Sequence, residues 1–420
     1  MHKLNSFIFR FRVIIGVLAL TMSAIPKPAV AQPASMGTVE ERVADIDWLI
    51  DTIASRYAYL DEEQVDLEAM RVLYRQEAIF ATTRNSWLHV LEDLLANLHD
   101  HHVNLNQNAR SSSQLVPSGT DIWARIVDNH AIVTEVLPKS PAAEAGLQAG
   151  DEIVAIGDTP TMIAIAAATP PATTPDHAGD YILRVLLAGD HERVRVLTLA
   201  DGHRIVMPPY VRSSSPEMIN WRWLDGNIGY IRIENSLGAD DTVAAFDTAV
   251  EELHGANGLV LDLRFTPNGG NTGVAIPILG RFVSQSGAYQ RYEGEQFEGG
   301  VELDTVNPRG PFTITAPVVV LVGHWTGSMG EGMAIGLDAL ERATTIGTPM
   351  AGLRGGIKGF ALPNTGVGFG LPVFRIFHIN GTPREAFDPS VLVDLTMEHG
   401  ADPVLAAGVE YLHQREADLP

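Results

Sequence analysis

The residues best suited to chemistry lie in a glycine-rich turn around Ser328, in HWTGSMGEGMAIGLDALERA (324–343). The turn follows the apolar run PVVVLVG and precedes helical periodicity, so it joins a predicted buried strand to a predicted helix. A serine at such a junction can cap the helix, or its hydroxyl can act as a nucleophile beside the positive end of the helix dipole. Gly327 and Gly330 leave space for a substrate backbone, which favours the nucleophile.

A second glycine-rich turn, in LDLRFTPNGGNTG (261–273), also follows a predicted buried strand. Acyl transfer needs backbone N–H groups that stabilise the oxyanion as it forms. The N–H of Met329, next to Ser328, is one predicted donor, and the N–H of Gly269 or Gly270 is the other. Together the two turns could form an oxyanion hole.

Three regions of different character must position these turns. Residues 38–110 have helical periodicity from a capping box at Thr38 onward. Residues 116–210 contain short β-rich runs between turns, and the proline-rich segment 168–179 is predicted to be a loop. Residues 216–415 alternate strand and helix patterns, which predicts an α/β core with buried strands.

The N-terminus has the pattern of a signal peptide. Basic residues precede the apolar run VIIGVLAL, and the small residues Ala29, Val30 and Ala31 offer a cleavage site. A membrane anchor is the alternative, but the run is too short to span a bilayer. We therefore expect removal of residues 1–31 and a periplasmic or secreted protein that is not inserted in the membrane.

Composition narrows the functional classes further. The formal net charge is −22, and it becomes −26 without residues 1–31, which carry four basic residues and no acidic residue. Such a surface repels nucleic acid and anionic lipid, so neither is an expected partner. The chain has no cysteine, which excludes disulfides and a lipoprotein anchor.

The segment VTEVLPKSPAAEAGLQAGDEIVAIGDTP (133–160) resembles a PDZ domain. Ser140 and Pro141 begin a short helix, Gly146 ends it, and Gly150 lies in the turn into the next strand. A PDZ domain adds an extended peptide to a sheet edge, so the resemblance implies a protein or peptide partner. The alternative is a PDZ domain that only packs against the core or gates it.

The two glycine-rich turns and the PDZ segment, in this order, resemble the C-terminal processing (tail-specific) peptidase and tricorn-core superfamily of serine peptidases. LDLRFTPNGGNTG is similar to the motif DLRxNxGG, and TGSMGEG is similar to TxSxxE. The resemblance covers residues 38–400 and implies Ser328 as nucleophile, without a metal or other cofactor. It also implies a crotonase-like (ClpP/crotonase-type) α/β catalytic core, a helical N-terminal domain and an inserted PDZ domain.

The two branches of this superfamily imply different general bases. The tail-specific branch implies a lysine about 25 residues beyond the serine, but Leu353 stands there, and the nearest lysine is Lys358. The tricorn-like branch implies a histidine from a motif similar to LxDxH, which LHDHH (98–102) matches with His102. A neutral imidazole near pH 7 can accept the serine proton and return it to the leaving amine.

Two other interpretations of LHDHH stay open. His99, Asp100, His101 and His102 could bind zinc, although adjacent residues point in different directions and the sequence offers no spaced motif such as HExxH. The segment could also be a solvated polar loop. The resemblance favours His102 as the base over both.

Two glutamates complete the set that the resemblance implies. Glu385, in TPREAFDP, matches a late glutamate of the tricorn-like branch that orients the histidine, although Asp388-Pro389 departs from the usual Pro-Asp. Glu331 stands three residues after Ser328, where it could orient water, histidine or substrate, or only cap the helix. Met329 replaces an acidic residue of the tricorn core, so that branch's specificity is not transferred.

The sequence therefore predicts an exported serine endopeptidase that cleaves protein or peptide substrates. Ser328 is the nucleophile, His102 the base and Glu385 its orienting group, with Lys358 as the alternative base. A binding protein on the same fold, which holds a peptide or apolar ligand without cleaving it, is the alternative of another class. Homo-oligomerisation is compatible with the sequence but is not predicted by it.

Overall fold

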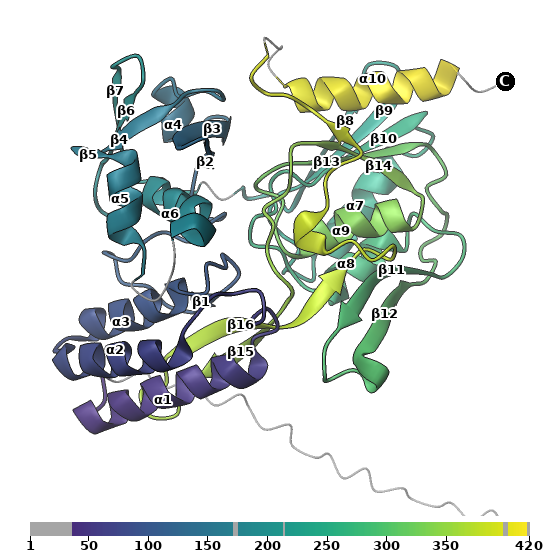
Figure 1. Ribbon diagram of the computed structural model, residues 1–420. Coiled ribbons are helices and arrows are strands. Elements are labelled where there is room, and N and C mark those ends of the chain that lie inside the picture. The colour runs from purple at the N-terminus through teal and green to yellow at the C-terminus, as the bar shows by residue number, and fades with distance from the viewer. Residues whose placement is uncertain (1–35, 171–174, 213–214, 398–401, 418–420) are drawn as a thin grey trace, which may run out of the picture.

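The computed structural model describes residues 36–170, 175–212, 215–397 and 402–417. The predicted signal peptide, residues 1–31, lies outside these ranges. None of the helices within them is long and apolar enough to cross a membrane. Figure 1 shows a helical part at the lower left, a β-rich part above it and an α/β part on the right.

The helical part contains three helices: α1 (Val39–Arg56), α2 (Leu67–Phe80) and α3 (Arg84–Ala96). Each begins after a side chain that accepts hydrogen bonds from first-turn N–H groups: Thr38, Asp66 and Thr83. Their apolar faces share one buried cluster with Phe369 and Leu371, which come from the C-terminal half of the chain. The helical part therefore does not complete its core with its own residues.

The β-rich part consists of two small sheets and three helices. Its elements are β2 (Ile122–Val127), β3 (His130–Val136), α4 (Pro141–Glu144), β4 (Ile153–Ile156), β5 (Thr159–Pro160), α5 (Thr161–Ala168), α6 (Pro175–Ala188), β6 (Arg195–Leu199) and β7 (Arg204–Met207). Strands β2 and β3 pair with each other, and the other four are ordered β5-β4-β6-β7. The prediction of a loop over 168–179 is wrong at both ends, because α5 extends to Ala168 and α6 begins at Pro175, where proline at a helix start costs no hydrogen bond. Residues 171–174 of that range lie outside the described residues.

The α/β part is built on a six-stranded sheet ordered β17-β14-β13-β10-β9-β8. All neighbouring pairs are parallel except β8 with β9. The strands are β8 (Ile219–Leu224), β9 (Ile228–Ile233), β10 (Gly258–Asp262), β13 (Val318–Val322), β14 (Ala343–Gly347) and β17 (Val391–Leu392). Strands β10 and β13 are buried along their whole length, as their continuous apolar runs predict.

Helices cover both faces of this sheet: α7 (Thr242–Glu252), α8 (Thr272–Leu279), α9 (Met329–Ala339) and α10 (Pro403–Ala417). Leu261 and Val320 pack with α7, α8 and α9, whereas the neighbouring Val260 and Val319 pack with α10. This alternation gives three layers, and the predicted α/β core is confirmed.

A second sheet joins the α/β part to the helices. Its strands are β1 (Asn104–Leu105), β11 (Gly287–Glu293), β12 (Val301–Val306), β15 (Gly356–Ala361) and β16 (Gly368–Phe377), with the 3₁₀ helices η1 (Glu298–Gly300) and η2 (Arg384–Ala386) nearby in the chain. Strand β16 pairs with β1 and β15 through its first half and with β11 through its second half. It therefore links the helical part, which carries LHDHH, to the part that carries Ser328 (Figure 1).

Candidate active site

Ser328 lies where β13 gives way to α9, as its glycine-rich surroundings predict. Its φ and ψ are 51° and −109°, a conformation that a residue with a side chain rarely adopts. The second glycine-rich turn lies directly against it, since Thr266 and Thr326 form a parallel bridge. A Cβ on Gly269 would lie 2.5 Å from the Ser328 Cβ, so only glycine fits there. Strained backbone of this kind is common at functional sites.

His102 reaches this serine from the helical part of the molecule. Its Nε2 lies 3.1 Å from the Ser328 hydroxyl, and its Nδ1 lies 2.5 Å from the carbonyl oxygen of Arg354. A carbonyl oxygen can only accept, so Nδ1 carries the proton and Nε2 presents a lone pair to the hydroxyl. Nucleophile and base are thus within hydrogen-bond reach although 226 positions separate them.

Burial keeps this imidazole neutral. Desolvation, followed by the positive charge of Arg384, lowers the pKa of His102 to about 3. Asp100 holds the backbone of the same loop, since its carboxylate accepts from the His102 N–H at 2.8 Å and from the Tyr57 hydroxyl at 3.1 Å. Burial also raises the pKa of Asp100 to about 7.

Two of the three predicted oxyanion donors remain available. The Gly269 N–H donates to the Thr266 carbonyl oxygen at 2.9 Å, so it cannot also bind an oxyanion. The Met329 nitrogen lies beside Gly269, 2.8 Å from the position that a Cβ on Gly269 would occupy. Gly270 packs on the Leu237 backbone, where a Cβ would lie 2.1 Å from the carbonyl oxygen. Met329 and Gly270 are therefore the candidate donors.

Glu331 is fully buried and bonded to backbone rather than exposed to a substrate. Its carboxylate accepts from the N–H of Ser328 at 2.6 Å and from those of Gly352 and Leu353 at 2.8 and 3.2 Å. Burial raises its pKa to about 7. The carboxylate thus forms its half of a capping box at the start of α9, and the Ser328 hydroxyl also lies within hydrogen-bond distance of His102.

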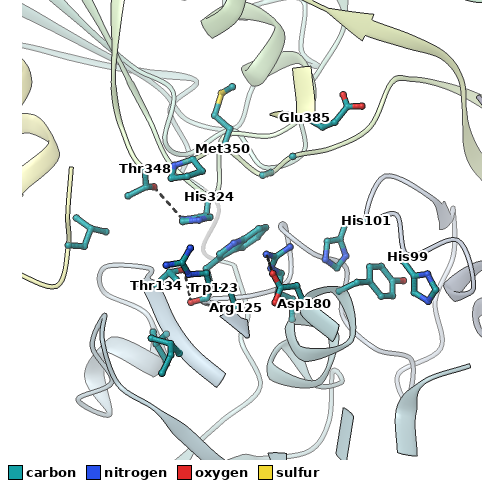
Figure 2. A pocket seen from close by; sticks show the side chains of 18 of the residues that line it. His99, His101, Trp123, Arg125, Thr134, Asp180, His324, Thr348, Met350 and Glu385 are labelled. Carbon is teal, nitrogen blue, oxygen red and sulfur yellow. Dashed lines mark hydrogen bonds and ion pairs between the residues drawn. The ribbon is translucent and has the colours of Figure 1, made fainter. Parts of the chain in front are cut away.

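Glu385 does not orient His102 in this structure. The Arg354 carbonyl occupies the position at Nδ1 where a carboxylate was expected. Within the described ranges, the buried Glu385 Oε2 has no hydrogen-bond partner. After burial, the charge of Glu385 is the next cause that raises the pKa of Tyr59, so the carboxylate faces the tyrosine. Figure 2 shows Glu385 pointing away from the labelled histidines.

We expect Glu385→Gln to lower kcat by less than about tenfold, because no proton of His102 is bonded to this carboxylate. Steady-state cleavage of a peptide would measure the effect, with Glu41→Gln at the exposed capping box of α1 as the matched control. A loss of about a thousandfold or more would place Glu385 in the relay after all, since replacing a triad carboxylate by its amide costs about 10⁴-fold.

In the part of the chain that the structure describes, neither Lys358 nor a cluster of metal ligands lies beside the serine. Lys358 is exposed on β15, with its ammonium 5.8 Å from the Phe360 ring centroid. Leu353, at the position where the tail-specific branch implies a lysine, is buried against Gly327. Its side chain lies 3.2 Å from the position that a Cβ on Gly327 would occupy. His101 stacks on Tyr181 at 4.4 Å, and among the described residues no three potential metal ligands cluster.

The PDZ-like part is docked against the nucleophile turn. Glu135 on β3 accepts a hydrogen bond from His324 Nδ1 at 2.6 Å and from the Thr348 hydroxyl at 2.7 Å. His324 begins the turn that leads to Ser328, and its ring lies 4.9 Å from that of Trp123. Trp123, His324 and Thr348 line a cavity of about 630 Å³ between the parts (Figure 2).

The groove beside β2 is closed by its own helix. The Ile126 N–H donates to Asp180 at 2.7 Å, and Arg184 donates to the Ala124 carbonyl at 3.3 Å, both from α6. A Cβ on Gly179 of α6 would lie 2.7 Å from the Ile126 side chain, so helix and strand are in contact. An added peptide strand would need the same main-chain groups of β2.

Comparisons with known proteins agree with this architecture. Residues 227–393 match the model of Peptidase family S41, and residues 132–199 match that of the PDZ domain. The core is a peptidase family S41 domain. A carboxyl-terminal-processing protease of Synechocystis sp. is 30% identical over 300 residues, which are 68% of this chain and 65% of that protein. The match thus spans less than two thirds of the curated relative.

Solved structures show the same fold at lower identity. The photosystem II D1 C-terminal processing protease has a TM-score of 0.54 at 19% identity, covering 84% of this chain and 93% of that structure. Mature CPAF has a TM-score of 0.58 at 14% identity, covering 90% and 96%. The predicted family and the predicted combination of α/β core and PDZ domain are confirmed.

Two groups that act on His102 in this structure were not predicted from the sequence. One is the Arg354 carbonyl, which no side-chain pattern can reveal because it is main chain. The other is Arg384, whose charge lowers the pKa of His102 after burial does. Arg384 directly precedes Glu385 in TPREAFDP, so it lies within the matched segment, but the family resemblance implied a role only for the glutamate.

Proposed function

We propose that this chain is an exported serine endopeptidase that uses Ser328 and His102 on protein or peptide substrates. The observation that carries the proposal is the 3.1 Å approach of His102 Nε2 to the Ser328 hydroxyl, with Nδ1 bonded to a carbonyl oxygen. Family S41 supplies the reaction class, and the N-terminal pattern VIIGVLAL followed by Ala29-Val30-Ala31 supports export to the periplasm or beyond.

The reaction begins when Ser328 Oγ attacks the carbonyl carbon of the peptide bond. His102 Nε2 takes the hydroxyl proton, and the N–H groups of Met329 and Gly270 bind the oxyanion. The imidazolium then gives this proton to the leaving amine as the C–N bond breaks, which leaves an acyl-enzyme. A water molecule repeats the sequence on the ester and releases the carboxylate product.

The imidazolium in this mechanism has no carboxylate at Nδ1. The Arg354 carbonyl stabilises it by accepting the Nδ1 proton in a hydrogen bond. Buried Asp100 and Glu331 provide the nearby negative charge when they are ionised. The low pKa of His102 makes the neutral base abundant but the imidazolium costly.

The test is incubation of the mature protein with an unfolded protein, followed by mass spectrometry of the products. New peptide termini in the wild type, and none in Ser328→Ala, support the proposal. A binding protein on the same fold would retain the unfolded protein and release no new termini. The candidate base at the serine argues against that alternative, because a binder needs none.

We also propose that the PDZ domain is in a closed state that excludes peptide until α6 moves. Its support is the engagement of Ala124 and Ile126 by Arg184 and Asp180. The double variant Asp180→Ala/Arg184→Ala should therefore bind a labelled peptide with a free C-terminus about tenfold more tightly than the wild type. Fluorescence anisotropy on the Ser328→Ala background measures this without cleavage.

The matched control for the groove removes an exposed ion pair of the same domain, Asp158 with Arg204. This control should bind the peptide as weakly as the wild type. Equal affinity of wild type and groove variant would show that α6 does not obstruct the site, and the PDZ domain would then be open to peptide in solution.

A further inference from the structure

One short loop contacts the candidate base, His102, through a main-chain carbonyl group. Residues 352–355 present the Arg354 carbonyl oxygen to His102 Nδ1 at 2.5 Å. A hydrogen bond of this kind sets both the tautomer and the tilt of the ring. The position of the base therefore depends on what holds this loop.

A buried carboxylate holds the loop by its N–H groups. Glu331 accepts from Gly352 at 2.8 Å and from Leu353 at 3.2 Å, and its other oxygen accepts from Ser328 at 2.6 Å. One side chain thus binds both the backbone of the nucleophile and the backbone next to Arg354. Its side chain is 0% exposed, so water does not compete for these bonds.

A buried guanidinium holds the same loop by its carbonyl groups. Arg384 donates to the carbonyl oxygens of Leu353 at 2.6 Å and Gly355 at 2.9 Å. These two residues flank Arg354, so the carbonyl between them is fixed from both sides. Arg384 is 3% exposed, and its Nε lies 3.9 Å from the Glu331 carboxylate.

We propose that Arg384 and Glu331 are a pair of positioning residues that set the geometry between His102 and Ser328. The inference rests on the proposed peptidase function. Neither residue contacts the reacting atoms: Glu331 acts through the Ser328 N–H and both act through the Arg354 carbonyl. Arginine suits this place because its Nη2 donates to both carbonyl oxygens while its Nε lies near the Glu331 carboxylate, so one rigid group spans the loop and the acid.

The experiment compares Arg384→Met, Arg384→Lys and Glu331→Gln by steady-state cleavage and by the rate of labelling with a fluorophosphonate. We expect Arg384→Met to lower kcat about a hundredfold with KM within about threefold, because a small misplacement of a catalytic group costs about that much. Lysine should restore part of the loss. In proton NMR, the Nδ1–H signal that is absent from His102→Ala should also be lost from Arg384→Met.

The matched control is Arg342→Met. Arg342 lies beyond the other end of α9 and donates to the carbonyl oxygens of Phe282 at 2.7 Å and Ile314 at 2.8 Å. It should lower Tm as Arg384→Met does, yet keep kcat and the His102 signal. Equal kcat in Arg384→Met and wild type would overturn the positioning role, and so would equal losses of kcat in Arg384→Met and Arg342→Met. Either result would leave the proposed peptidase function standing. A folded wild type that is not labelled at all would overturn the proposed function and this inference with it.

Discussion

Replacing Ser328 with alanine should lower kcat on a peptide substrate by roughly 10⁶-fold. The hydroxyl lies 3.1 Å from His102 Nε2, and the turn that carries it packs against Gly269 of the second glycine-rich turn. Without this hydroxyl, no acyl-enzyme forms, and what remains is the stabilisation of the oxyanion by Met329 and Gly270. Substrate binding should persist, so KM should change far less than kcat.

Covalent labelling with a fluorophosphonate reports on the same serine directly. The folded wild type should be labelled at Ser328, and the alanine variant should not be. The control is Ser236→Ala, which removes a hydroxyl that donates to the Met218 carbonyl in the same domain. Equal labelling of Ser328→Ala and wild type would show that the probe reacts elsewhere and that Ser328 is not the nucleophile.

The nucleophile turn could be predicted because its determinants are local. An apolar run, a cluster of glycines and a helical period follow one another around Ser328, and they predict a buried strand, a turn and a helix in that order. The same holds for α1, where Thr38 and Glu41 form the expected capping box. Local patterns of this kind specify an element and its start.

The partner of the serine could not be predicted from such patterns. His102 and Ser328 come from different parts of the fold, and nothing in the spacing of LHDHH directs one histidine to that turn. Only the resemblance to a family selected His102. For Glu385 the same resemblance gave a role that the geometry assigns to the Arg354 carbonyl. A sequence motif specifies side chains, but a main-chain carbonyl can accept the hydrogen bond from Nδ1 in place of a carboxylate.

Elements that lack a clear period were the ones missed. Thr161–Ala168 forms α5, but TMIAIAAA is apolar on nearly every side and has no polar face to reveal a helix. Strand β16 was missed as a link between the parts, because β1 and β11 are distant from it in the chain and only β15, which ends at Ala361, is a local hairpin partner. These elements matter for function, since β16 joins the part with His102 to the part with Ser328.

Replacing His102 with alanine should lower kcat by roughly 10⁴- to 10⁶-fold, whereas Lys358→Ala should leave it within about twofold. The imidazole is the candidate base in contact with the Ser328 hydroxyl, and the lysine is exposed over Phe360. Both variants are compared by single-turnover cleavage at saturating substrate. A collapse in Lys358→Ala with little change in His102→Ala would reverse the assignment and indicate a serine–lysine dyad.

The pH profile separates His102 from its acidic neighbours. A base must be neutral to act, so activity falls as pH drops through its pKa. Because burial and then Arg384 lower the pKa of His102 to about 3, no loss due to this residue is expected near its ordinary value of about 6.5. Burial raises the pKa values of Asp100 and Glu331 to about 7, so a fall in activity as the pH drops through about 7 should come from their protonation and should be lost when both are replaced, in Asp100→Asn/Glu331→Gln. A limb near pH 6.5 that survives both substitutions would instead mean that His102 titrates as an exposed histidine does and that its burial does not set its protonation.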